Sequence, residues 1–323
     1  MIKAANWLTH LEYEWESPVW RHWIHFFSDQ FRFVRYDERG CGMTDLNVGD
    51  LSLERWVEDL ETVIAASNVE EPFSLLGISQ GGPICVAYAV RHPERVSKLV
   101  LYGAYARGVF QRGDPDRSSF YRAMIDLVRL EWGSDNPTFR QVFTSRFIPE
   151  GTDEQVGWFN DICRKTVTAD IAARLLESRA DLNVTELLGK VRTPTLVLHA
   201  RGDLRVPFEE GRMLAATIPD ARFVALESTN HILLEQEPAF AQLFEELQGF
   251  LGNAASFGGL TAREAQILEQ IAQGLDNAQI AARLELSEKT VRNHITSIFD
   301  KIGVESRAQA IVMARERGLG QRS

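Results

Sequence analysis

The sequence predicts an α/β protein with a doubly wound, mostly parallel sheet, followed by a small all-α domain of four helices. Strand-like and helix-like segments alternate from Phe31 to about Gly252, and this alternation is typical of a parallel sheet covered by helices on both faces. A run of small residues at 252–259 has the composition of a flexible linker. Only helical patterns follow it. We therefore expect domains at 1–251 and 260–320.

Five short runs rich in β-branched or aromatic residues predict the strands. They are Phe31–Tyr36, Phe73–Leu76, Lys98–Tyr102, Thr195–His199 and Arg222–Leu226. Helical segments such as Leu53–Ser67 and Pro83–Arg91 lie between them. From about 106 to 184 the strand signal is lost and aromatic residues recur at helical spacing. This change predicts a helical lid, whose aromatic residues serve either as packing or as the walls of a site for an apolar or acyl-bearing small molecule.

Composition excludes several classes of protein. The chain of 323 residues is 45% hydrophobic and 25% charged, as is ordinary for a soluble globular protein. It shows no secretory leader pattern and no run of 18 apolar residues, so we expect a cytoplasmic protein without a membrane span. Its three cysteines, Cys41, Cys85 and Cys163, have no metal-binding or redox spacing. We expect no cofactor and no metal.

A Gly-x-Ser-x-Gly pattern with Ser79 at its centre lies between the strand Phe73–Leu76 and the helix Pro83–Arg91. This context predicts a nucleophile elbow, in which the serine occupies a strained turn at the end of a strand. Serine becomes a nucleophile when a histidine accepts its proton and an acid fixes the tautomer of that histidine. Asp203 and His231 follow the next predicted strands in the required order. Carboxyl ends of parallel strands share one edge of the sheet, so we expect these three residues to meet.

Each of the three residues also has a structural explanation. Ser79 would then be an ordinary turn serine, Asp203 a turn aspartate of the common Gly-Asp type, and His231 a capping or core histidine. The other candidate histidines, His10, His22, His25 and His92, are interpreted as structural or surface groups.

These motifs resemble the α/β-hydrolase family over about residues 1–251. The segment 36–44 is similar to that family's Asp-x-Arg-Gly-x-Gly-x-Ser turn, and 91–96 is similar to the end of the helix after its elbow. The resemblance implies Ser79 as nucleophile, Asp203 as acid and His231 as base, with one oxyanion donor on the backbone N–H of Gln80.

Two departures from the family pattern concern the first residues. The usual His-Gly of the oxyanion loop is replaced by Ala5-Asn6-Trp7. Asn tolerates a positive φ, so we expect the loop to keep its conformation and Trp7 to supply the second donor, with Leu8 as the alternative. The family's first two strands have no counterpart before Ile2. Either the fold tolerates a clipped sheet edge or the chain begins further upstream.

The C-terminal pattern predicts four helices. The first begins with a capping box at Thr261 and Glu264 and ends at Gly274; Asn277 caps the second, Ala278–Leu284; Ser287 caps the third, which ends at Gly303; the fourth is Ser306–Arg317. In the third helix, apolar residues recur from Val291 to Ile302 at helical spacing, and polar residues cover the opposite face.

The segments 260–264, 277–281 and 290–304 look like the LuxR-type helix-turn-helix. That resemblance implies double-stranded DNA as a partner, the third helix in the major groove, and a fourth helix that dimerises. It places Arg292, Asn293 and Thr296 against bases. The residues expected at phosphates are Lys289, Thr290 and Lys301. His294 is interpreted as packed on the inner side.

The charge is divided unevenly along the chain. Residues 259–323 hold nine Lys/Arg and eight Asp/Glu, a net charge of +1, whereas the rest of the chain has a net charge of −11. The acidic part is repelled by DNA phosphates. We therefore expect a monomer to bind DNA weakly and a homodimer to be the binding form.

Three functions fit these features. The favoured one is a transcriptional regulator whose hydrolase-like domain binds a small acyl or ester ligand, with or without hydrolysing it. The alternatives are a working serine esterase with an accessory DNA-binding domain, and a non-catalytic ligand sensor with a relic triad.

Overall fold

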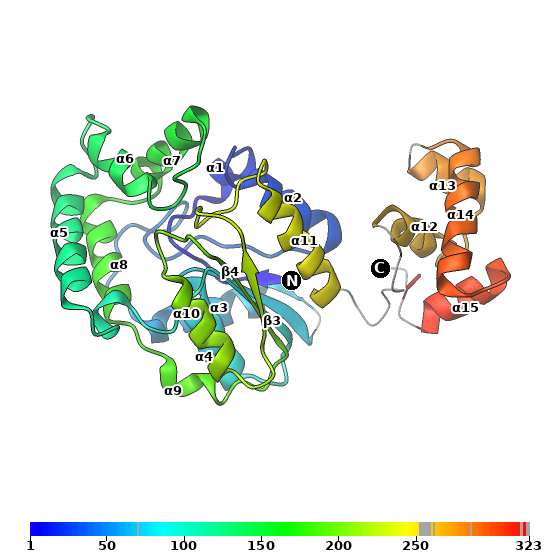
Figure 1. Cartoon of the computed structure of the whole chain (residues 1–323), viewed down its shortest axis with the longest axis horizontal. Coiled ribbons are helices and arrows are strands. Elements are labelled where there is room, and N and C mark those ends of the chain that lie inside the picture. Colours follow the sequence, from blue (N-terminus) through cyan, green and yellow to red (C-terminus); the bar gives the residue numbers. More distant parts are fainter. Residues whose placement is uncertain (70, 252–259, 261, 285, 317–318, 321–323) are drawn as a thin grey trace. The chain divides into compact units, whose positions relative to one another are not determined.

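The chain packs as two compact units, Met1–Glu246 and Leu247–Ser323. The structure is a computed structural model that describes residues 1–69, 71–251, 260, 262–284, 286–316 and 319–320 (Figure 1). The division between the units falls within helix α11 (Pro238–Leu251), a few residues before the expected boundary at 251. The expected linker at 252–259 lies outside the described residues.

The N-terminal unit is built on a five-stranded sheet in which every neighbouring pair of strands is parallel. In spatial order the strands are β1 (Ile2–Lys3), β2 (Phe73–Ile78), β3 (Val96–Tyr102), β4 (Thr195–Ala200) and β5 (Arg222–Leu226). The inner strand β4 is buried along its whole length, as expected for a parallel strand covered on both faces. This confirms the predicted α/β class and four of the five predicted strands.

Helices cover both faces of this sheet. In Figure 1, α2 and α11 lie on one side of the strands, and α4 and α10 lie on the other. Besides α11, the helices outside the lid are α1 (Leu11–Trp15), α2 (Arg21–Gln30), α3 (Leu53–Ser67), α4 (Gly81–Arg91), α9 (Thr185–Leu188) and α10 (Phe208–Thr217). The alternation of strands and helices in the sequence therefore gives the layered arrangement it predicted.

The predicted strand Phe31–Tyr36 is wrong. Only Val34 pairs there, through a single parallel bridge to Ile2. The Lys3 N–H donates to the Val34 carbonyl at 3.0 Å, and the Val34 N–H donates to the Met1 carbonyl at 3.0 Å. Because β1 is only two residues long, it offers no ladder on which a longer partner could align. The segment covers the edge of β1 without extending the sheet.

The predicted lid is present between residues 106 and 184. It consists of a 3₁₀ turn (Val109–Gln111) and the helices α5 (Pro115–Glu131), α6 (Thr138–Thr144), α7 (Asp153–Thr166) and α8 (Ala169–Asp181). An antiparallel bridge between Arg107 and Asn183 joins its two ends, and the Val184 N–H donates to the Ala106 carbonyl at 2.9 Å. In Figure 1 these helices group to one side of the strands.

Beyond the end of α11, the described residues of the C-terminal unit form four helices, α12 (Ala262–Ala272), α13 (Asn277–Arg283), α14 (Glu288–Ile302) and α15 (Arg307–Glu316). They share a core of its own. Its fully buried members include Leu268, Ile271, Ile280, Val291 and Ile298. Four helices were predicted, and the apolar stripe of α14 faces this core as its spacing indicated.

Helix boundaries in this unit agree with the prediction at two ends and differ at another. Ser287 caps α14, accepting from the Thr290 N–H at 3.1 Å, and Gly303 ends it in the left-handed conformation with φ 70°. The cap of α13 is Asp276, which accepts from the Gln279 N–H at 2.8 Å, and not Asn277 as predicted. The Asn277 side chain instead accepts from Arg307 at 3.0 Å, which ties α13 to α15. The expected cap Thr261 lies outside the described residues.

Candidate functional sites

Ser79 occupies a tight turn between β2 and α4. Its φ of +51° is left-handed, which is strained for a residue with a side chain. The Ser79 N–H donates to the Tyr102 carbonyl at 2.9 Å, and the Ser79 carbonyl accepts from the Gly82 N–H at 3.0 Å. A Cβ added to Gly77 would lie 2.9 Å from Gly82 Cα, so the turn depends on glycine on both sides. This geometry is that of a nucleophile elbow.

The structure brings the three predicted residues together in one hydrogen-bonded chain. His231 Nδ1 lies 2.6 Å from Asp203 Oδ2, so Nδ1 carries the proton and Nε2 is free to accept. Ser79 Oγ donates to His231 Nε2 at 2.8 Å. All three residues are buried. They follow the carboxyl ends of β2, β4 and β5, as strand order in an open parallel sheet predicts.

Asp203 is held as a carboxylate by the groups around it. Its Oδ1 accepts from the backbone N–H of Arg205 at 2.7 Å and of Val206 at 2.9 Å. Burial alone would raise the pKa of Asp203, but the charge and hydrogen bond of His231, with His199 and the Val206 N–H, bring that pKa below its ordinary value. The carboxylate therefore stays ionised and fixes the tautomer of His231.

His199 is a second histidine beside Asp203, and nothing in the sequence except its place in a predicted strand pointed to it. Its Nε2 lies 3.5 Å from Asp203 Oδ2 and 3.1 Å from the Val206 carbonyl, to which it donates. Burial lowers the pKa of His199, so the neutral imidazole is favoured. It supports the loop that carries Asp203.

Ser79 faces a very small pocket. Its wall includes both predicted oxyanion donors, Trp7 and Gln80, and the alternative Leu8. The pocket holds about 10 Å³, roughly the space of one water molecule. The ring of Phe147 closes one side, 5.6 Å from the ring of His231.

The expectation of a positive φ at Asn6 is wrong. Among the described residues other than glycine, the left-handed positions are Asn68, Ser79 and Asp220. The side chain of Asn6 accepts from Lys3 Nζ and donates to the Trp7 carbonyl at 3.2 Å. These hydrogen bonds hold the loop, so it needs no left-handed residue.

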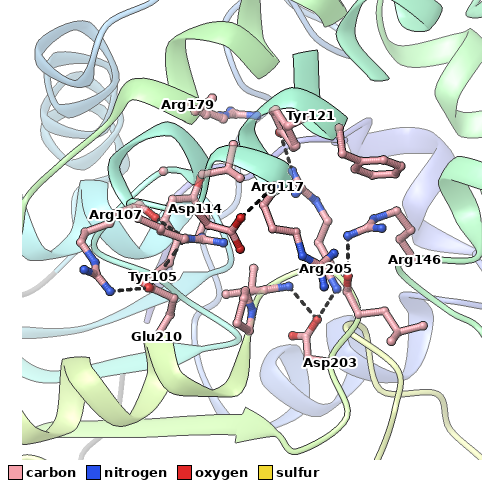
Figure 2. A pocket seen from close by; sticks show the side chains of 18 of the residues that line it. Tyr105, Arg107, Asp114, Arg117, Tyr121, Arg146, Arg179, Asp203, Arg205 and Glu210 are labelled. Carbon is pink, nitrogen blue, oxygen red and sulfur yellow. Dashed lines mark hydrogen bonds and ion pairs between the residues drawn. The ribbon is translucent and has the colours of Figure 1, made fainter. Parts of the chain in front are cut away.

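A larger cavity of about 720 Å³ lies between the lid and the loop after β4. Six arginines line it: Arg107, Arg112, Arg117, Arg146, Arg179 and Arg205. All but Arg112 are labelled in Figure 2. Asp203 forms part of the same wall. Of the lid aromatics that suggested an apolar site, Phe120 and Tyr121 line this cavity, Phe159 lines the small pocket at Ser79, and Trp132 is buried. The lining thus combines aromatic side chains with arginines.

The predicted DNA-reading residues lie on one exposed face of α14. Lys289, Arg292, Asn293 and Thr296 are exposed, opposite the buried stripe that begins at Val291.

The side chains of Thr290 and Lys301, which the sequence predicts at phosphates, already have hydrogen-bond partners within the protein. Thr290 is half-buried, with its hydroxyl 2.8 Å from Ser287 Oγ. Lys301 donates to the two oxygens of buried Glu264 at 2.9 and 2.7 Å. His294 is half-buried, in keeping with a packed position.

Two further kinds of site are absent from the part of the chain that the structure describes. No group of His, Cys, Asp and Glu side chains there could hold a metal ion. No helix there has the length and apolar character needed to cross a membrane.

The elbow at Ser79 on a parallel sheet defines a hydrolase-type α/β domain, and the four-helix unit with its polar-faced third helix defines a DNA-reading domain. Residues 13–238 match the family model of the alpha/beta hydrolase fold. Residues 259–314 match that of the bacterial regulatory proteins of the luxR family. The chain belongs to the α/β hydrolase fold family, and its hydrolase domain is fused to a LuxR-type DNA-binding domain.

Individual relatives agree with this division. A putative carbamate hydrolase, RutD, of Agrobacterium fabrum is 26% identical over 233 residues, which are 69% of this chain and 84% of that protein. The DNA-binding transcriptional activator DevR/DosR of Mycobacterium tuberculosis is 38% identical over 96 residues, which are 30% of this chain and 44% of that protein. Among solved structures, an esterase (EaEST) from Exiguobacterium antarcticum has a TM-score of 0.65 at 22% identity, covering 78% of this chain and 91% of its own.

Proposed function

We propose that the protein is a transcriptional regulator that binds DNA as a homodimer and whose hydrolase domain binds and cleaves a small acyl or ester ligand. The observation that carries the catalytic part is the unbroken chain of hydrogen bonds from Ser79 through His231 to Asp203. Its fusion to a LuxR-type domain supports the regulatory part, since a regulator commonly couples a ligand pocket to a DNA-reading helix.

The proposed reaction is acyl transfer to Ser79. Its Oγ attacks the ligand carbonyl while His231 Nε2 accepts the hydroxyl proton, and Asp203 stabilises the imidazolium. The backbone N–H groups of Gln80 and Trp7, or of Leu8 in place of Trp7, would donate to the oxyanion. The tetrahedral intermediate expels the alcohol, which takes the proton from His231. Water, activated by His231, then releases the acid and restores Ser79.

A second candidate is a sensor that binds its ligand without turnover. The small pocket of about 10 Å³ at Ser79 and the separate cavity of about 720 Å³ that Ser79 does not line favour this second candidate. In that case the triad is a relic and ligand binding alone changes DNA binding.

A serine-reactive fluorophosphonate probe tests the catalytic part. We expect the folded protein to become labelled and Ser79→Ala to abolish labelling, because the Ser79 hydroxyl donates to the imidazole base of His231. Ser145→Ala is the matched control, since Ser145 lines the large cavity and its hydroxyl donates to the Val142 carbonyl. An unlabelled folded wild-type protein would reject catalysis and leave the sensor. A reporter assay with Ser79→Ala then shows whether regulation needs turnover.

DNA binding is tested on α14. We expect Arg292→Ala to weaken binding by about 1–3 kcal/mol at one base pair and to relax specificity there, as for an arginine that reads a guanine. Fluorescence anisotropy with duplexes selected by the wild-type protein measures the affinity. In a footprint on the same duplexes, the homodimer should protect an inverted repeat. Arg212→Ala, an exposed arginine on α10, is the charge-matched control. Unchanged affinity of Arg292→Ala, or a footprint of a single half-site, contradicts the proposal.

The role proposed for Lys301 needs a separate readout. Its ammonium group already neutralises Glu264, which is buried. We expect Lys301→Ala to lower the free energy of unfolding of the C-terminal unit by about 1–3 kcal/mol, because a buried carboxylate loses its cation. If the variant is as stable as wild type and loses affinity evenly across sequences, Lys301 contacts phosphate as the sequence predicted.

A further inference from the structure

We propose that the arginine-lined cavity is the binding site for an anionic small molecule with a carboxylate or phosphate group, anchored by Arg146 and Arg205. The inference rests on the proposed function in one respect, that this molecule is the ligand of the same hydrolase domain. Its binding itself is independent of turnover at Ser79.

The cavity has the size and position of a ligand site. Its volume of about 720 Å³ lies within the range of about 300–1,000 Å³ that small-molecule sites occupy. The lid supplies Arg117 and Arg146, and the loop after β4 supplies Arg205. Figure 2 shows Arg146 and Arg205 approaching the cavity beside Asp203.

The acidic residues of the cavity wall are already used. Asp203 accepts from His231. Glu210 is paired with Arg107 at 2.8 Å and lies 3.7 Å from Arg112. Asp114 caps α5, where it accepts from the backbone N–H of Arg117 at 2.9 Å.

Among the described residues, three guanidinium groups of the wall are therefore not neutralised by a carboxylate. Within the described ranges, Arg117, Arg146 and Arg205 form no ion pair with a carboxylate. Arg146 donates to the Leu204 carbonyl at 2.8 Å, and Arg205 donates to the Tyr121 hydroxyl at 3.0 Å. Arg179, by contrast, is paired with buried Glu38. A surplus of positive charge in a partly buried cavity selects an anion.

Arg205 is positioned as an anchor. Its guanidinium carbon lies 5.4 Å from the ring centroid of Tyr121 and 5.5 Å from that of Phe147, which holds the plane of the group. Its Nε is a buried donor without a hydrogen-bond partner in the described structure. A buried unpaired donor is costly, the more so on a charged group. An oxyanion at this point would satisfy it.

Arg146 adds a second charge close to the first. Burial lowers the pKa of Arg146, and the nearby charges of Arg205 and Arg117 lower it further. Repulsion of this kind shows that the three cations share one region of the cavity. A bound anion would relieve that repulsion, and a planar carboxylate or a phosphate can accept several guanidinium hydrogen bonds at once.

The anion site adjoins the triad through two elements. The backbone N–H of Arg205 holds Asp203 Oδ1 at 2.7 Å. The ring of Phe147 lies 5.5 Å from the Arg205 guanidinium carbon and 5.6 Å from the His231 ring. A molecule anchored by its anionic end at Arg205 would thus present its other end across Phe147, toward Ser79. The substrate class for the proposed reaction is an acyl or ester compound with a remote acidic group.

Calorimetric titration of the full-length protein with defined probes tests this assignment. The probes are glutarate, its neutral diamide glutaramide, and inorganic phosphate, at low ionic strength. We expect an anion to bind and glutaramide not to bind. Arg205→Gln and Arg146→Gln should each weaken anion binding at least about tenfold, as loss of a charge-assisted hydrogen bond implies. Arg146 is half-exposed, so its variant tests the site even if Arg205→Gln fails to fold.

Arg212→Gln is the matched control, because it removes one exposed positive charge outside the cavity. Binding of glutarate alone or of phosphate alone supports the proposal and assigns the anionic group. Equal binding of glutaramide, equal weakening by Arg212→Gln, or no binding of either anion at millimolar concentration overturns it. Fluorophosphonate labelling of Ser79 in the same samples keeps the two proposals apart, since labelling without anion binding rejects only the anion site.

Discussion

Two histidines, His22 and His199, are buried and each is committed to a backbone carbonyl. His22 Nε2 donates to the Leu233 carbonyl at 2.9 Å, and His199 Nε2 donates to the Val206 carbonyl at 3.1 Å. Burial lowers the pKa of both residues from the ordinary value of 6.5. Neither residue is part of the serine–histidine–aspartate chain, so their effect is on stability.

Stability of the N-terminal unit should therefore fall on acidification. Below pH 6.5 the unfolded chain takes up protons on these two histidines that the folded chain does not, so the free energy of unfolding decreases as pH falls, by at most about 1.4 kcal/mol per pH unit and histidine. Urea denaturation between pH 7.5 and about pH 5 measures the slope. His199→Gln, whose side-chain amide can still donate, should reduce it. His25→Gln replaces an exposed histidine and is the control; an equal reduction there would refute the assignment.

Sites whose residues each follow a strand could be predicted from the order of the strands. Sites whose residues come together only in the folded structure could not. Ser79, Asp203 and His231 each follow a strand, so parallel topology alone brings them to one edge. The arginines of the cavity come from the segment 107–146, from α8 and from the loop after β4, and no spacing in the sequence relates them. Asp276 and Asn277 are both good capping residues, so the pattern could not decide between neighbours.

At the scale of elements, the junction of β2 and α4 shows how closely the helix approaches the sheet at the turn that carries Ser79. A Cβ added to Gly82 would lie 2.5 Å from the Cβ of Ala104, so the first turn of α4 packs on the end of β3 without room for a side chain. The predicted helix Pro83–Arg91 began two residues too late, because α4 starts with two glycines, which are poor helix formers. Gly82 is required by the contact with Ala104, and a Cβ on Gly81 would lie 3.3 Å from the Ala4 carbonyl oxygen.

Gly82→Ala should lower the free energy of unfolding by about 1–3 kcal/mol, as overpacking of a tight core contact does. It should also reduce fluorophosphonate labelling of Ser79, since the turn must shift. Gly157→Ala is the matched control, because Gly157 lies inside α7 with open space around it. That substitution should stabilise by about 0.5–1 kcal/mol. Equal effects of the two changes in urea denaturation would show that the contact with Ala104 is not limiting.

Strand prediction failed at the element whose partner is too short. The segment Phe31–Tyr36 has strand composition, yet composition cannot report that β1 offers only Ile2 and Lys3 for pairing. The prediction of the lid was correct because local contacts close this segment at both ends. Its ends are joined near residues 106 and 184 by local hydrogen bonds, so the loss of strand signal coincides with a real structural boundary.

At the scale of the whole molecule, the two parts of the chain differ in charge. Residues 259–323 have a net charge of +1 and the remainder has a net charge of −11. Each part has its own buried core, that of the C-terminal unit being formed by α12 to α15. A hydrolase domain of this charge repels DNA phosphates at any distance shorter than a few Debye lengths.

The fragment 252–323 should consequently bind non-specific duplex DNA more tightly than the full chain at low salt. The difference should shrink as salt rises, because the Debye length falls from about 10 Å at 0.1 M to about 3 Å at 1 M. Anisotropy titrations of both proteins across this range measure it, and sedimentation of each sample ensures that the same oligomeric state is compared. Equal affinities at low salt would mean that the acidic domain lies too far from the bound DNA to repel its phosphates. Repulsion could not then be the means by which a ligand in the hydrolase domain controls DNA binding, and dimerisation through α15 would be the remaining means to examine.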